Sequence, residues 1–235
     1  MKMIPSLAVL FALVVLEPRS SPLRAAQEDG VALAIIFDTS GSMKDPVADK
    51  SGHSSPKYLI ANRALEEMAN RIQRFATNSA GGTPRKIEAG LFVFRGDGAR
   101  EAVKFGPFDA GALRHFARSF TTPSGNTPLG NALNIASQPV LNSPFSRKHV
   151  LVVTDGMNTA GPAPAAVLPK IKQQAQQNHT TVSFHFVAFD VDAKVFDAIK
   201  KQGATVVSAA DETQLNSQLE FILQNKILLE DEEKK

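Results

Sequence analysis

Three short segments of the chain carry side-chain oxygens of the kind that bind a hard divalent cation. The first segment, Asp38-Thr39-Ser40-Gly41-Ser42, directly follows the apolar run 31–37. Such a continuous run of aliphatic and β-branched residues is typical of a buried parallel strand, and ligands bind at the carboxyl ends of such strands. One carboxylate and two hydroxyls at that position suit Mg²⁺ better than a soft or redox-active metal.

Two later segments add polar side chains beside other predicted elements. A second apolar run, 149–154, ends in Asp155-Gly156, and the loop 124–130 carries Thr127 in front of a helical pattern. Along the chain, the strand before Asp38 is the first and the strand before Asp155 is the fourth. In the common doubly wound order these two strands are neighbours at the point where the winding reverses, so their polar ends share one crevice. The sequence therefore predicts one site formed by Asp38, Ser40, Ser42, Thr127 and Asp155.

Each of these side chains also has a simpler structural explanation. Ser40 and Ser42 could be turn hydroxyls that bond their own backbone. Thr127 precedes Pro128, a usual first helical residue, and is a natural N-cap. Asp155-Gly156 could be a plain turn. Only the coincidence of three loops at one sheet edge favours the metal site over these explanations.

The three segments together resemble the von Willebrand factor type A (VWA) domain with a complete metal-ion-dependent adhesion site (MIDAS). The family's Asp-x-Ser-x-Ser motif is matched by Asp38, Ser40 and Ser42, its Gly-x-Thr loop by Thr127, and its Asp-Gly turn by Asp155. The similarity extends from about residue 31 to residue 223. It implies that the three hydroxyls coordinate a divalent cation directly and that the two aspartates help to position waters. One coordination position would then be open to an outside carboxylate; Mg²⁺ is the expected ion, with Mn²⁺ and Ca²⁺ as alternatives.

The alternation of predicted strands and helices indicates an α/β fold, a three-layer sandwich. We expect a doubly wound, mostly parallel, six-stranded sheet, and the VWA resemblance implies that it is Rossmann-like. Gly96-Asp97-Gly98 predicts a hairpin and hence one antiparallel edge strand. The predicted strands cover 31–37, 87–94, 101–105, 149–154, 180–189 and 205–208. The predicted helices cover 58–77, 109–119, 129–137, 163–177 and 193–201, and a last one begins near residue 211.

The N-terminal residues have the pattern of a secretory signal. Met1-Lys2 precedes an uncharged apolar stretch, 4–16, that is shorter than a membrane span. We expect a signal peptide at 1–26, the VWA domain at 27–229 and a charged tail at 230–235. The protein would be secreted or periplasmic. An uncleaved N-terminal anchor is the alternative, and it alone would bring the protein to a membrane.

Composition excludes several classes of function. The chain has no cysteine, so it has no disulfides, thiolate metal sites or cysteine nucleophiles. Its net charge of +3 falls to +1 without residues 1–26, and no basic stripe stands out, so we expect no nucleic-acid partner. The five histidines show no ligand spacing, and His149 and His185 are expected to lie along strands.

Two further motifs have structural explanations. Arg95-Gly96-Asp97 matches an integrin-recognition tripeptide, but a hairpin turn is the favoured interpretation. Asp190-Val191-Asp192 could hold a second cation, although loop solvation or capping of the next helix is favoured.

These observations predict an exported, metal-dependent protein-binding module that is not an enzyme. Its partner would be a protein that presents an Asp or Glu side chain to the cation. One alternative is a Mg²⁺-dependent, phosphatase-like hydrolase in which Asp38 is phosphorylated, but Ser40 occupies the position where that chemistry usually has a second acid. Another alternative is a VWA subunit that docks on an intracellular ATPase, which export disfavours.

Overall fold

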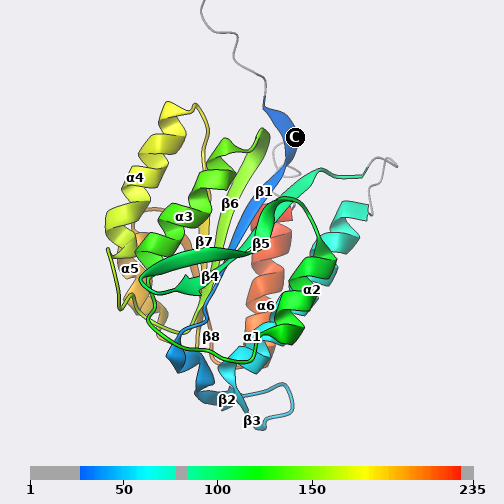
Figure 1. The fold of residues 1–235 in the computed structure, drawn as a ribbon, viewed down its shortest axis with the longest axis vertical. Helices are drawn as coiled ribbons and strands as arrows, with labels where there is room; N and C mark the ends of the chain where they lie inside the picture. The colour runs from blue at the N-terminus through cyan, green and yellow to red at the C-terminus, as the bar shows by residue number, and fades with distance from the viewer. Residues whose placement is uncertain (1–26, 78–83, 229–235) are drawn as a thin grey trace, which may run out of the picture.

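The computed structural model describes residues 27–77 and 84–228; the predicted signal peptide and charged tail lie outside these ranges. A six-stranded sheet in the order β5-β4-β1-β6-β7-β8 lies between two layers of helices (Figure 1). Its strands are β1 (Glu28–Phe37), β4 (Ile87–Arg95), β5 (Gly98–Pro107), β6 (Phe145–Thr154), β7 (Ser183–Phe189) and β8 (Thr205–Ala209). The predicted α/β fold class is confirmed.

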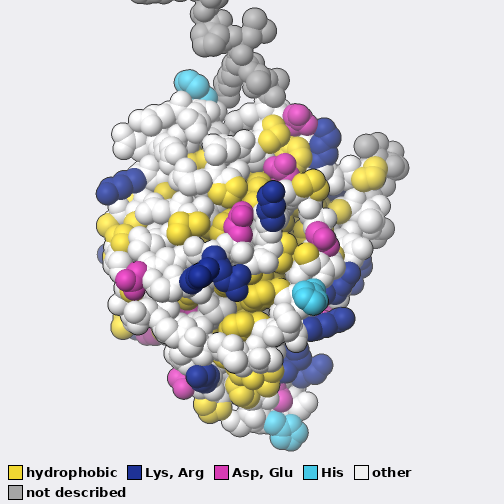
Figure 2. Space-filling model, in the orientation of Figure 1, with side chains coloured by type: hydrophobic (Ala, Val, Ile, Leu, Met, Phe, Trp, Pro, Cys, Tyr) yellow, Lys and Arg dark blue, Asp and Glu magenta, His cyan; other side chains and the backbone are white. Residues whose placement is uncertain are grey.

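The edge strand β5 is the antiparallel one, as predicted. It pairs with β4 across a tight turn in which Arg95 lies opposite Gly98, whereas all other neighbouring strands of this sheet are parallel. Gly96 has a φ of 57°, a conformation that glycine adopts without steric cost. The Arg-Gly-Asp tripeptide is therefore part of this hairpin turn. Figure 2 shows basic, acidic and hydrophobic side chains interspersed on the face that carries β5.

One layer of helices covers each face of the sheet (Figure 1). The first layer contains α1 (Lys57–Thr77), α2 (Ala110–Ser119), α6 (Glu212–Ile222) and the π-helical η3 (Leu223–Leu228). The second contains α3 (Leu129–Asn142), α4 (Pro164–Gln177), the 3₁₀ turn η2 (Ala193–Phe196) and α5 (Asp197–Lys200). The predicted helix 193–201 is thus two short pieces. Within the described part of the chain, no helix is both long and apolar enough to cross a membrane.

The central strand β1 supplies side chains to both hydrophobic cores. Leu33 and Ile35 pack with α1 and α6, whereas Ala34 and Ile36 pack with α3 and α4, and all four are fully buried. Successive side chains of a strand point to opposite faces, so a strand covered on both faces is apolar throughout. This explains why the run that precedes Asp38 shows no alternation.

The segment 41–56, between β1 and α1, forms a small projection. It contains the 3₁₀ turn η1 (Gly41–Lys44) and a two-stranded hairpin, β2 (Pro46–Ala48) and β3 (Ser54–Pro56). At the tip, the Asp49 carboxylate accepts the backbone N–H groups of Ser51 at 2.8 Å and His53 at 3.0 Å. Figure 1 shows the hairpin at the lower end of the molecule, beyond the ends of the central strands.

Candidate metal centre

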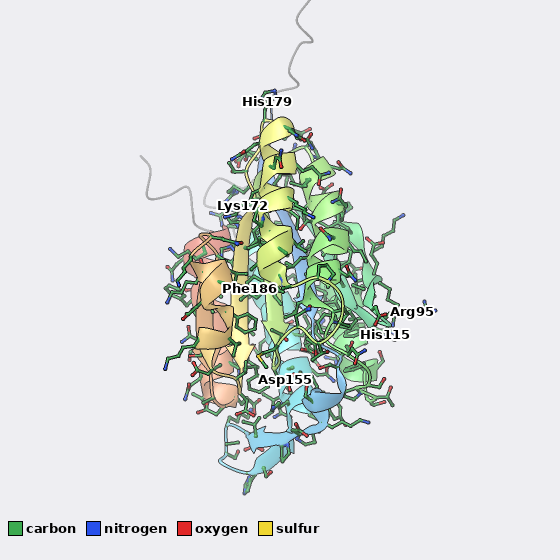
Figure 3. The ribbon with its side chains drawn as sticks, turned by 90° about the vertical axis from the view of Figure 1, so that its left-hand side faces the viewer. Arg95, His115, Asp155, Lys172, His179 and Phe186 are labelled. Atoms are coloured by element: carbon green, nitrogen blue, oxygen red, sulfur yellow. The ribbon has the colours of Figure 1, made fainter. Side chains whose placement is uncertain are left out.

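The carboxyl ends of β1 and β6 place two aspartates at the same edge of the sheet. The two strands are parallel neighbours, and the backbone N–H of Asp38 donates to the carbonyl of Val153 at 3.0 Å. Asp155 follows the end of β6, and Figure 3 shows it toward the lower end of the molecule, at the opposite end from His179. Asp38 is fully buried and Asp155 is 6% exposed. The predicted neighbourhood of the first and fourth sheet strands is confirmed.

Both carboxylate oxygens of Asp38 are held by hydrogen bonds. Oδ1 accepts the backbone N–H of Ser40 at 2.7 Å, and Oδ2 accepts the hydroxyl of Thr154 at 2.5 Å. Burial and the nearby charge of Asp155 raise the pKa of Asp38 to about 6, although these hydrogen bonds act in the opposite direction. The strand end and the turn thus fix the orientation of this carboxylate.

The two serine hydroxyls connect the turn after β1 to the turn after β6. The Oγ atoms of Ser40 and Ser42 lie 3.1 Å apart, and Ser42 Oγ donates to Asp155 Oδ1 at 2.8 Å. The simpler explanation, in which these hydroxyls bond only their own backbone, does not describe this arrangement. The Ser42–Asp155 bond joins residues 113 positions apart in the sequence.

The loop that carries Thr127 is fixed to the turn after β1. The backbone N–H of Ser124 donates to Thr39 O at 2.8 Å, and that of Gly41 donates to Gly125 O at 3.1 Å. A Cβ atom placed on Gly156 would lie 3.6 Å from Thr127 Oγ1 and 4.0 Å from Ser42 Oγ. The hydroxyls of Thr127 and Ser42 therefore both lie close to Gly156, in the turn that carries Asp155.

Thr127 does not cap the helix that follows it. Helix α3 begins at Leu129, and its N-cap position is Pro128, which makes no side-chain capping bond. Thr127 is instead held through its backbone, because its N–H donates to Thr159 Oγ1 at 2.8 Å and its carbonyl accepts the N–H of Thr159 at 3.0 Å. Its side chain is thus available for another role.

A lysine that the sequence analysis missed lies at the same site. Lys57, the first residue of α1, places Nζ 3.1 Å from Asp155 Oδ2 and 2.9 Å from Asp190 Oδ2, and its side chain is only 7% exposed. Burial alone would lower the pKa of Lys57, but its bonds to Asp190 and Asp155 outweigh that effect and raise it. Lys57 therefore carries a positive charge inside the site.

One sequence signal could have drawn attention to Lys57. A cation in the first turn of a helix is repelled by the positive end of the helix dipole, so it needs acidic neighbours from elsewhere. Asp190, at the end of β7, is one of these neighbours. Asp192 has a separate role, because its carboxylate accepts the backbone N–H of Lys194 at 2.9 Å and caps η2.

The donor set fits a hard divalent cation. Two carboxylates and three hydroxyls offer only oxygen atoms, as Mg²⁺ and Mn²⁺ prefer. Over residues 27–77 and 84–228, no three His, Cys, Asp or Glu side chains are grouped so that they could hold a metal ion. A cation at this edge would therefore depend on the neutral hydroxyls of Ser40, Ser42 and Thr127.

The sequence matches the family model of the von Willebrand factor type A domain over residues 32–221. The chain belongs to this family. VWA domains typically mediate protein interactions, and the sheet order and helical layers described above are those of a VWA domain. A search of the curated proteins finds no match.

Solved structures with the same fold include three proteins that are each less than 20% identical to this chain. The PilB minor pilin from Streptococcus sanguinis is 16% identical, with a TM-score of 0.62, over 87% of this VWA chain and 62% of the pilin. Proximal thread matrix protein 1 from the mussel byssus, with its MIDAS motif occupied by zinc, is 15% identical over 84% of this chain and 48% of that one, at a TM-score of 0.59. The manganese-loaded TRAP protein of Plasmodium vivax is 16% identical over 83% of this chain and 72% of that one, at a TM-score of 0.53.

Proposed function

We propose that this VWA domain is an exported, metal-dependent protein-binding module. Its MIDAS would consist of Asp38, Ser40, Ser42, Thr127 and Asp155. The observation that carries the proposal is the contact of Ser42 Oγ with both Ser40 Oγ and Asp155 Oδ1; the Thr127 hydroxyl lies close to Gly156, in the same turn as Asp155. These oxygens come from three separate loops, and a hard cation is the ligand that such a set suits.

The chemistry of the donors favours an acidic partner. A divalent cation bound here would act as a Lewis acid that accepts one further hard ligand, best supplied by an Asp or Glu carboxylate. Ser40, Ser42 and Thr127 contribute no negative charge of their own. Asp38, fixed by Ser40 N–H and Thr154, would orient the first segment and its waters.

Two of the structural relatives support a metal at this position. The mussel protein has zinc in its MIDAS motif, and the Plasmodium protein is loaded with manganese. At 15% and 16% identity, the similarity to these proteins shows a shared fold and no more. The metal of this protein is therefore a proposal, with Mg²⁺ preferred over Mn²⁺ and Ca²⁺. Export rests on the pattern of Met1-Lys2 and the apolar stretch 4–16.

We propose that the domain binds and does not catalyse a reaction. A carboxylate nucleophile needs a neighbouring acid for the leaving group, and Ser40 stands in that position. Both oxygens of Asp38 already accept hydrogen bonds. Incubation with a chromogenic phosphate ester and Mg²⁺ tests this point: turnover that is lost in Asp38→Ala would support the hydrolase instead.

Calorimetric titration with Mg²⁺ and Mn²⁺ tests the metal site. The wild type should bind one ion, and Asp38→Ala should bind none while its circular dichroism spectrum stays the same. Asp109→Ala is the matched control, because Asp109 is an exposed aspartate that caps α2 away from this site. Equal heats from wild type and Asp38→Ala would refute the proposal.

A second experiment tests the acidic partner. Proteins retained by the immobilised domain in Mg²⁺ and released by chelator would be identified, and their exposed Asp and Glu residues changed to Asn and Gln. Loss of binding with one such change is the expected result. Retention that is unaffected by chelator would contradict metal-dependent recognition.

A further inference from the structure

Lys57 forms a buried bridge between two acidic groups that lie on different strand ends. Its Nζ contacts Asp155 Oδ2, and Asp155 Oδ1 accepts the hydroxyl of Ser42, so each oxygen of this carboxylate has one defined partner. Asp190 holds Lys57 from the other side, at 2.9 Å. The ammonium is therefore paired directly with Asp155, a residue of the proposed metal site.

The position of Asp190 is itself tightly defined. Its backbone has a φ of 54°, rare for a residue with a side chain, and its N–H donates to Ala209 O at 2.7 Å. Lys57 is thus fixed by α1, by the turn after β6 and by the end of β7. The Lys57 side chain therefore has little conformational freedom, and its charge is held at one position in the site.

We propose that Lys57 is a positioning residue that weakens the hold of the site on its cation and strengthens the hold of that cation on an anion. The inference rests on the proposed function, and it specifies how the same site selects a carboxylate. The ammonium shares the negative charge of Asp155, which then neutralises less of the cation's charge. It also repels the cation and attracts an incoming carboxylate.

The expected size follows from simple electrostatics. A unit charge several ångströms from the bound ion, in surroundings of intermediate dielectric constant, changes each affinity on the order of tenfold. The two affinities should move in opposite directions. A residue that served only to keep the site folded would change both in the same direction.

Two variants that each remove one charge, and a third that keeps it, test this inference on the whole chain. Lys57→Met keeps the length of the side chain and removes its charge; Asp190→Asn keeps an acceptor and removes the negative charge that offsets Lys57. Calorimetry gives the affinity for Mn²⁺. Acetate titrated into the Mn²⁺-loaded protein, followed by the relaxation of water protons, gives the affinity for a carboxylate.

Lys57→Met should bind Mn²⁺ about tenfold more tightly and acetate about tenfold more weakly. Asp190→Asn should show the opposite changes, and Lys57→Arg, which keeps the charge, should remain close to wild type in both. Parallel losses in both affinities, or no change in either, would overturn the inference. If Lys57→Met does not fold, Asp190→Asn decides the question by the same criterion. A wild type that binds no Mn²⁺ would instead refute the proposed function.

Discussion

Two buried polar clusters lie along β6, and they deal with burial in opposite ways. At the carboxyl end, the Lys57 ammonium pairs with Asp155, whose charge in turn acts on Asp38. In the middle of the sheet, His149 Nδ1 lies 3.2 Å from His185 Nε2, and their rings stack with centroids 5.5 Å apart. The first cluster contains opposite charges, whereas the charges that shift the second come from the positive side chains of Arg147 and Lys226.

The histidine pair is neutral because of this difference. Burial, and then the nearby charges of His185 and Arg147, lower the pKa of His149 to about 3. Burial and Lys226 lower the pKa of His185 to about 4. Burial thus disfavours the charged form of the histidines, whereas the ion pair with Asp155 keeps Lys57 charged. Of the two clusters, only the one at the sheet edge is therefore suited to a cation.

The largest expected effect is the loss of stability that the histidine pair causes in acid. In the unfolded chain the histidines take up protons below about pH 6.5, whereas in the fold they do so only near pH 4 or below. The free energy of unfolding should therefore fall from about pH 6.5 to about pH 4, by roughly 1.4 kcal/mol per pH unit for each histidine.

Denaturant titrations across this pH range test that prediction. The variant with both His149→Leu and His185→Leu should lack this part of the slope. Asp38, whose raised pKa acts in the opposite direction, is present in both proteins and cancels in the comparison. Identical slopes for the two proteins would show that the histidines are not held neutral.

Removing the countercharge should damage the edge cluster nearly as much. Without metal, Lys57→Met leaves the buried carboxylate of Asp155 without its cation, and we expect a loss of about 3–5 kcal/mol in unfolding free energy. Mg²⁺ should restore part of this loss, because a bound cation replaces the missing charge and stabilises the folded state. Denaturation with chelator and with Mg²⁺ measures both values; an equal loss in the two conditions would contradict the account.

Glu212 is a third buried charged residue, and it lies outside the proposed metal site. Glu212, 2% exposed, accepts Arg63 Nε and Nη2, each at 2.7 Å, and the backbone N–H of Lys50 at 3.0 Å. It thus ties α6 to α1 and to the β2–β3 hairpin. Glu212→Gln should cost about 1–3 kcal/mol in chemical denaturation and leave Mg²⁺ affinity unchanged. A change in metal affinity would mean that this network belongs to the site.

The smallest effect on stability is expected from a second ion pair between α1 and α6, which is more exposed to solvent. Glu220 of α6 bonds Arg71 of α1 at 2.5 Å, and its side chain is 41% exposed. Glu220→Gln should change the unfolding free energy by less than about 1 kcal/mol, because water screens exposed pairs. It is the matched control for Glu212→Gln; equal losses in the two variants would show that burial does not set the cost.

The sheet was predictable from the sequence because its inner strands are apolar on both faces. The continuous apolar runs at β1 and β6 identified these strands by themselves, and Gly96-Asp97-Gly98 indicated the hairpin. The hairpin β2–β3 was not predicted, since three-residue strands carry no periodic pattern. The predicted helix 193–201 is in fact a 3₁₀ turn followed by a single helical turn. The two together have the hydrophobic spacing of one continuous helix, so the sequence pattern did not separate them.

The oxygen cluster was predictable from strand counting, whereas Lys57 could be suspected from its place at a helix start but not assigned to this site. Asp38 and Asp155 follow strand ends, so topology alone places them together. Lys57 reaches Asp155 across 98 residues, and this contact depends on where α1 begins after the β2–β3 hairpin, which was itself not predicted. Its pairing with Asp190 further depends on an unusual backbone conformation. Neither feature leaves a repeating pattern in the sequence.

Anomalous scattering from crystals grown with Mn²⁺ would locate the ion directly. We predict a single peak at the carboxyl edge of the sheet, roughly 2 Å from the hydroxyl oxygens of Ser40 and Ser42 and from that of Thr127. The Lys57 ammonium should remain paired with Asp155 beside it. The absence of a peak at saturating Mn²⁺, or a peak that lies away from these three hydroxyls, would contradict the account.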